Sequence, residues 1–281
     1  MNSADTPMSP LMRIVFWFVA ANALAGALSL VLFPHNTATL FFWQIAPPLN
    51  AALFGALYFG GAVVVALVTY QGRWEAARFL IPVLVTAGVL IALTTFLHLE
   101  RFTPGLKLWY WLVIYVGAPL LAGLFYFQHE RAGANWSAQE PIAPTTRRVA
   151  IVVGVLLIAA GIFTLARPMA VVEAWPWPTS PLMVRIFASW FSAFGVGLLW
   201  MLRERDWGHM RHMANLMIAA AVLDLAMLII HRGDLTGDSV RVGIFCAHLA
   251  LFGLVGGLMH WLQWRATRSG SARQPQRAPS V

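Results

Sequence analysis

One carboxylate and one histidine stand out because their types and spacing could move a proton inside a membrane. Asp224 lies in the apolar run AAVLDLAMLI, where an unpaired carboxylate is energetically expensive. Asp224 lies seven residues before His231, and His248 lies seven residues after Arg241, so a helical hairpin places Asp224 and His248 at one depth. We therefore expect Asp224 to face the bundle interior beside His248. The pair is then either a hydrogen bond that fixes helix packing or a proton-linked ligand site.

Two further histidines, His98 and His231, end apolar runs at the same predicted face. If their helices flank a common axis, the two imidazoles could hold a metal or a haem iron. Alternatively, each histidine caps a helix C-terminus, whose partial negative charge favours a hydrogen-bond donor. His209 and His212 fall in a predicted loop at the opposite face. The chain contains no HExxH, P-loop, GxGxxG or CxxCH motif, so no motif names a reaction, a cofactor or a substrate, and the sequence favours a role without catalysis.

The elements that must position these residues are transmembrane helices. Of the 281 residues 59% are apolar and 11% are charged, whereas a soluble domain carries about 25% charged residues. A transmembrane helix needs about 20 apolar residues. Eight runs meet this requirement or come close to it, which predicts an all-α, polytopic membrane helix bundle with spans at 11–33, 51–70, 79–98, 108–127, 149–166, 186–202, 213–231 and 242–264.

The positive charges predict how the chain crosses the membrane. Most of the 19 Lys and Arg residues lie at position 13, in the stretches 71–78, 129–147 and 203–212, and after residue 264. The loop 34–50 has none. Positive residues favour the cytoplasmic side, so we expect a multi-pass protein of the cell membrane with both termini in the cytoplasm. The net charge of +8 is thereby explained as a topology signal, and we expect no nucleic-acid partner.

The sequence also repeats itself. A shift of 133 residues aligns Pro48 with Pro181, Trp74 with Trp207, Arg78 with Arg211 and His98 with His231. Each half then has an even number of spans, so the halves are expected to be parallel repeats related by an axis along the membrane normal. The same shift aligns Ile91 with Asp224 and Tyr115 with His248, which predicts that any site built on Asp224 belongs to the second half.

These signals divide the chain into a first four-helix repeat at 1–128, a cytoplasmic linker at 129–147, a second four-helix repeat at 148–265 and a basic, disordered cytoplasmic tail at 266–281. Three functions stay open. The protein binds or carries a small molecule or lipid through a proton-linked pair of Asp224 and His248. It is a structural or assembly subunit that packs against membrane protein partners. Or it is a membrane redox protein that holds haem b or quinone through histidines.

Overall fold

The computed structural model describes residues 6–131 and 136–271, and these residues form helices and connecting loops without a sheet. Eight helical segments are long and apolar enough to cross a membrane, which confirms the all-α, eight-span prediction. The spans are α1 (Pro10–Leu32), α3 (Pro48–Gln71), α4 (Trp74–Ala77) with α5 (Leu80–Phe96), α6 (Leu106–Leu112) with α7 (Ala118–Arg131), α8 (Pro144–Ala166), α10 (Pro181–Leu199), α11 (Trp207–Ile230) and α12 (Ser239–Ser271). Short helices at the loops are α2 (Thr37–Leu40) and α9 (Pro168–Ala174), with 3-10 turns at Pro34–Asn36, Leu99–Arg101, Trp200–Leu202 and Arg232–Asp234.

Helix starts explain most differences from the predicted span boundaries. Pro48 and Pro181 open α3 and α10, because a proline ring is tolerated in a first turn that lacks N–H partners. The prediction of a loop at His209 and His212 was wrong. Helix α11 begins at Trp207, where the Asp206 side chain accepts a hydrogen bond from the Gly208 N–H at 2.7 Å. Both histidines are therefore buried in its first turns.

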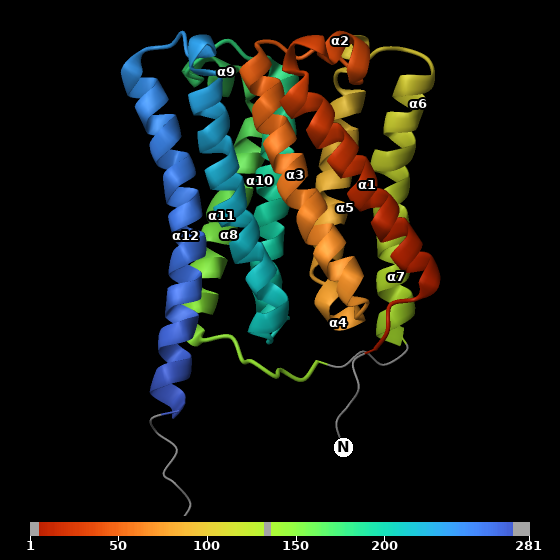
Figure 1. Cartoon of the computed structure of the whole chain (residues 1–281), viewed down its shortest axis with the longest axis vertical. Helices are drawn as coiled ribbons and strands as arrows, with labels where there is room; N and C mark the ends of the chain where they lie inside the picture. Colours follow the sequence, from red (N-terminus) through yellow and green to blue (C-terminus); the bar gives the residue numbers. More distant parts are fainter. Residues whose placement is uncertain (1–5, 132–135, 272–281) are drawn as a thin grey trace, which may run out of the picture.

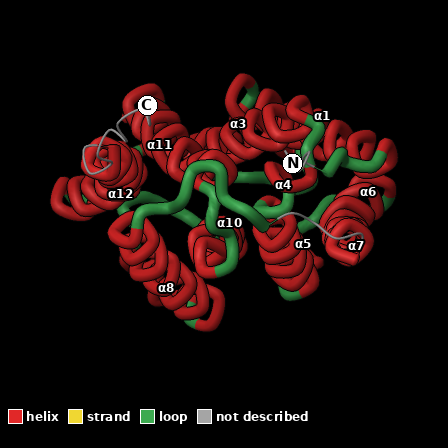
Figure 2. Tube along the Cα trace, turned by 90° about the horizontal axis from the view of Figure 1, so that it is seen from below, coloured by secondary structure: helices red, strands yellow, loops and turns green. Residues whose placement is uncertain are grey.

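The spans form two layers (Figure 2). Helices α11, α3 and α1 lie in one row, and α8, α10 and α5 lie in the other. Within the first row α3 packs on both α11 and α1, and within the second row α10 packs on both α5 and α8. Figure 1 shows that α1 begins and α12 ends at the same side of the bundle. We call this the inner side, and it is the side predicted to be cytoplasmic.

Burial separates four central spans from four outer ones. The spans built on α3, α5, α10 and α11 bury at least half of their most apolar stretch, whereas those built on α1, α7, α8 and α12 bury 22%. Large apolar side chains such as Ile14, Val113, Leu156 and Leu254 are exposed on the outer spans. Exposed apolar surface on this scale is compatible with a lipid bilayer and not with water.

Several contacts of Trp74 recur at Trp207, although their partners are not aligned at the shift of 133 residues. The Trp74 N–H donates to the Thr6 carbonyl at 2.8 Å, and the Trp207 N–H donates to the Glu140 carbonyl at 2.7 Å. Trp74 also stacks on His129 with ring centroids 4.6 Å apart, while Trp207 meets His260 edge-on at 5.2 Å. These pairs are what a parallel duplication would produce. The two-fold repeat itself stays a proposal that they support.

The predicted linker and tail differ slightly from the observed helix ends. Helix α7 ends at Arg131 and α8 begins at Pro144, so the connection is shorter than 129–147. Helix α12 continues to Ser271, beyond the predicted end of the second repeat at residue 265. The remainder of the predicted tail, 272–281, lies outside the described residues.

Candidate functional site

A large cavity lies in the first half, between α1, α3, α5 and the α6–α7 span. It is a cavity of about 580 Å³, within the range of about 300–1,000 Å³ typical of small-molecule sites. Its lining runs along α1 from Ile14 to Ser29, about 22 Å at the rise of an α-helix. The walls are mostly aliphatic and aromatic, and no Asp, Glu, Lys, Arg or His is among the lining residues of the described chain.

The cavity lies at one end of the two-layer bundle, where the layers do not close. At the opposite end α8 packs directly on α12. At this end α1 and α7 stand on two sides of the cavity. Some side chains line the cavity and are also exposed at the surface of the bundle. They are Ile14 and Phe18 on α1, and Val113 and Leu121 on the α6–α7 span. Because these side chains are apolar, the opening faces hydrocarbon, and a ligand would arrive from the bilayer.

A local distortion of the α6–α7 span shapes this wall. Residues Val113–Gly117 form a π-helical turn directly before Pro119. A proline lacks the N–H that would bond the carbonyl four residues earlier, here that of Tyr115, and its ring crowds that carbonyl. Gly88 of α5 accommodates the ring, because a Cβ atom at Gly88 would overlap Pro119. The wide turn presents Val113, Ile114 and Tyr115 to the cavity, and π-helical turns are frequent at functional sites.

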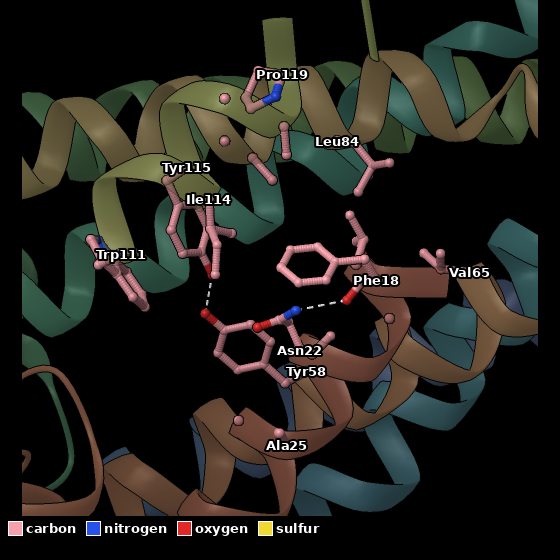
Figure 3. Close-up of a pocket in the computed structure, with 18 of the residues that line it drawn as sticks. Phe18, Asn22, Ala25, Tyr58, Val65, Leu84, Trp111, Ile114, Tyr115 and Pro119 are labelled. Carbon is pink, nitrogen blue, oxygen red and sulfur yellow. Dashed lines mark hydrogen bonds between the residues drawn. The ribbon is translucent and has the colours of Figure 1, made fainter. Parts of the chain in front are cut away.

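Figure 3 shows three polar side chains, those of Asn22, Tyr58 and Tyr115, close together in the apolar cavity, and Tyr110 also lines it. The hydroxyls of Tyr58 and Tyr115 point toward each other and are hydrogen-bonded. The Tyr110 hydroxyl donates to Asn22 Oδ1, and Asn22 Nδ2 donates to the Phe18 carbonyl at 2.8 Å. The side chains therefore come from α1, α3 and the α6–α7 span, so that a single molecule in the cavity could touch all three.

Trp190 of α10 brings the second half into the site. Its ring lies edge-on to Tyr58, with centroids 5.6 Å apart, and it lines the cavity. The indole Nε1 is buried and has no hydrogen-bond partner among the described residues. Buried donors are almost always satisfied. Because this nitrogen is covered by protein atoms, it is not among the groups that the cavity offers to a ligand.

In comparisons with protein-family models, with curated proteins and with solved structures, nothing matches this chain. The site is therefore argued from its own geometry.

The structure places Asp224 inside the bundle but gives it no direct partner. Asp224 is 4% exposed, and its Oδ1 has no hydrogen-bond partner among the described residues. A Cβ atom at Gly253 of α12 would lie 2.8 Å from Cβ of Ala221, so Asp224, one turn further along α11, is level with the turn of α12 around residue 249. His248 belongs to that turn, and its ring lies 6.1 Å from the ring of Phe191. No hydrogen bond joins Asp224 to His248 in the described chain, and their pairing stays a prediction.

His231 is the C-cap of α11, whereas His98 lies one residue beyond Leu97, the C-cap of α5, and its partners are other residues. Arg185 Nη1 of α10 lies 2.8 Å from His98 Nε2, and Glu100 lies 3.8 Å from its Nδ1. Partial burial lowers the pKa of His98, and the neighbouring Arg185 cation lowers it further. The backbone N–H of His231 closes α11 onto the Met227 carbonyl. Within the described residues no group of three or more His, Cys, Asp or Glu side chains is arranged to hold a metal ion.

A buried ion pair connects the halves near the inner side. Arg78 Nε donates to Glu204 Oε2 at 2.5 Å, both side chains are fully buried, and His209 Nδ1 lies 3.6 Å from the other carboxylate oxygen. Burial alone would raise the pKa of Glu204, but hydrogen bonds from His209 and Arg78 and the charge of Arg78 outweigh it and lower the pKa to about 2. The Arg78 guanidinium also lies 3.7 Å from the ring centre of Trp136 in the linker. These contacts bind the two halves and the linker together, away from the cavity.

The cavity was not predicted from the sequence, although one feature of the sequence indicates it. All five tyrosines lie before residue 127, and three of them, Tyr58, Tyr110 and Tyr115, line the cavity. Tyrosine hydroxyls are therefore present in the first half and absent from the second half of the sequence. Hydropathy could not show this, because tyrosine is as common in a lipid-facing aromatic belt as in a binding site.

Proposed function

We propose that the protein binds a small, lipid-like molecule in the cavity between α1, α3, α5 and α7, and that the molecule enters laterally from the bilayer. The observation that carries this proposal is the cavity itself: about 580 Å³ of apolar space that opens between two lipid-facing helices and contains a few convergent polar groups. A site of this kind selects an apolar molecule by its shape and orients it by a few hydrogen bonds.

The proposal keeps the predicted binding or carrying of a small molecule or lipid and moves its main site to the first half. The proton-linked pair of Asp224 and His248 is a separate proposal for how such a molecule would be moved. We also propose that the membrane is the cell membrane and that both termini are cytoplasmic, which the distribution of positive charge supports. In a variant without Cys246, an impermeant thiol label should then reach Thr236→Cys but not Gln139→Cys in intact cells.

Cavity filling provides the test. Ala23 lines the cavity on α1, whereas Ala21, two residues earlier on the same helix, is exposed and does not line it. We expect native mass spectrometry in mild detergent to find a bound molecule of a few hundred daltons on the wild type and on Ala21→Phe. Ala23→Phe should lose it, because the new ring occupies the cavity. The same adducts on all three proteins, or none on the wild type, contradict the proposal.

A further inference from the structure

We propose that the ligand is an uncharged lipid whose head is a flat ring bearing carbonyl oxygens, which is the chemistry of a quinone. This inference rests on the proposed lipid-binding function and names its ligand class. Three features of the cavity carry it: the absence of charge, the hydrogen-bond donors that remain available to a ligand and the separation of aromatic from aliphatic lining.

The length of the cavity suits a lipid chain. Its lining runs about 22 Å along α1. A hydrocarbon chain can therefore extend along it.

The lining also selects against charge. A charged head group in this apolar space would lose its hydration without gaining an ionic partner, because no charged side chain lines the cavity in the described chain. Fatty acid anions, phosphate esters and amines are disfavoured on this ground. The polar part of the ligand must be neutral and must be satisfied by hydrogen bonds alone.

The cavity offers hydrogen-bond donors to a ligand. Each tyrosine hydroxyl carries one proton, and the bond between Tyr58 and Tyr115 uses only one of the two. The second hydroxyl proton is available to a ligand. Asn22 has a second amide proton beyond the one bonded to Phe18. A ligand with acceptor oxygens, such as carbonyls, satisfies these donors.

Aromatic rings gather around the polar groups, whereas the inner part of the cavity is largely aliphatic. Trp111 packs on Tyr115 with centroids 4.2 Å apart and on Phe42 at 4.7 Å, and Phe42 stacks on Tyr110. The inner part is lined by side chains such as Ile14, Val19, Leu80 and Leu84. A flat ring gains contact with aromatic faces and edges, and an alkyl chain suits the aliphatic part. The head would lie near Tyr58, with the chain toward the inner side.

Three probes with the same decyl chain separate the features of the head. Decylubiquinone has a ring with carbonyls, decylbenzene has the ring alone, and decyl acetate has the carbonyl alone. We expect titration calorimetry of the delipidated full-length protein in detergent to give decylubiquinone at least a tenfold lower Kd than either of the other two. The expected gain comes from hydrogen bonds and ring contacts acting together.

Variants of the tyrosine pair test the donor inference. Tyr58→Phe and Tyr115→Phe each leave one hydroxyl whose proton can reach the ligand, so each should retain decylubiquinone binding within a few-fold. The double variant removes both protons and should weaken decylubiquinone at least tenfold while leaving decylbenzene unchanged. Tyr126→Phe, which lies outside the cavity lining, is the matched control. Unfolding of the double variant would be visible as loss of decylbenzene binding, and Asn22→Leu then provides the second test of a donor.

The outcomes distinguish this inference from the proposed function. If the three probes bind equally and Ala23→Phe abolishes them all, the cavity binds apolar molecules but the quinone class is wrong. If a decylubiquinone preference survives the double tyrosine variant and Asn22→Leu, the donors assigned here are wrong. If no probe binds and native mass spectrometry finds no adduct, the lipid-binding function itself is wrong.

Discussion

Equivalent positions in the two halves carry different chemistry. Tyr58 and Tyr115, which bond to each other in the cavity wall, correspond to Phe191 and His248 at the repeat shift of 133 residues. Those two rings also lie close together, 6.1 Å apart. The contact between the two helices is therefore present in both halves, but hydroxyls occupy it in the first. We infer that the first half binds the ligand, whereas titratable groups are concentrated in the second.

Asp224 tests whether the second half moves a proton. Asp224→Asn keeps the size of the side chain and removes its charge. Because Asp224 does not line the cavity, we expect this variant to fold and to bind the ligand as tightly as the wild type. If the predicted pair of Asp224 and His248 is proton-linked, the variant should lose movement of the ligand driven by a pH gradient in reconstituted vesicles.

Asp238→Asn makes the same chemical change in the exposed loop before α12 and should leave this transport intact. Transport that continues in Asp224→Asn would identify the carboxyl as a packing group. A wild-type protein that binds the ligand but moves none of it contradicts the carrier function and leaves binding alone.

At the scale of the helices, the α6–α7 span is the element that opens the cavity. The spans could be predicted because apolar length alone identifies them. The cavity could not, because it depends on how the helices are spaced, and a π-helical turn such as the one at Val113–Gly117 is not marked by apolar length. Small residues set such distances. Gly88 lets Pro119 approach α5, and Gly253 lets α12 approach Ala221 in the other half.

Substitution of Gly88 tests this account of the α5–α7 contact. In Gly88→Ala the new methyl group would overlap the Pro119 ring, so we expect a loss of about 1–3 kcal/mol in stability, as overpacking usually costs. Adding Pro119→Ala removes the ring and should restore most of the loss. Thermal unfolding in detergent measures both changes.

Gly123→Ala is the control for this pair, because nothing lies within 4 Å of the position that its Cβ would take. Its better helix propensity should make it neutral or stabilising by about 1 kcal/mol. A Gly88→Ala protein as stable as the wild type would show that α7 can move away from α5 at no cost.

At the scale of the whole molecule, contacts between the halves hold the bundle together. The central helices α3, α5, α10 and α11 carry the interface, and the ion pair of Arg78 and Glu204 closes it near the inner side. The sequence repeat indicated two halves, and it aligned Arg78 with Arg211. It did not indicate that Arg78 pairs with Glu204, because an ion pair across the repeat leaves no periodic signal.

The ion pair makes stability depend on pH in a defined direction. The pKa of Glu204 is about 2 in the folded protein, below the ordinary value of 4.5 for a glutamate. The contribution of the ion pair to stability is therefore complete above about pH 4.5, and it is lost as the pH falls from about 4.5 toward 2.

Glu204→Gln leaves the Arg78 cation buried without its carboxylate, which should cost about 3–5 kcal/mol at neutral pH. The variant should also show a smaller decline of unfolding temperature across the acid range than the wild type. Glu173→Gln, an exposed carboxylate on α9, should match the wild type in both respects. A Glu204→Gln protein with wild-type stability at neutral pH would show that the halves are held by apolar packing alone, since the loss of this carboxylate would then not weaken their interface.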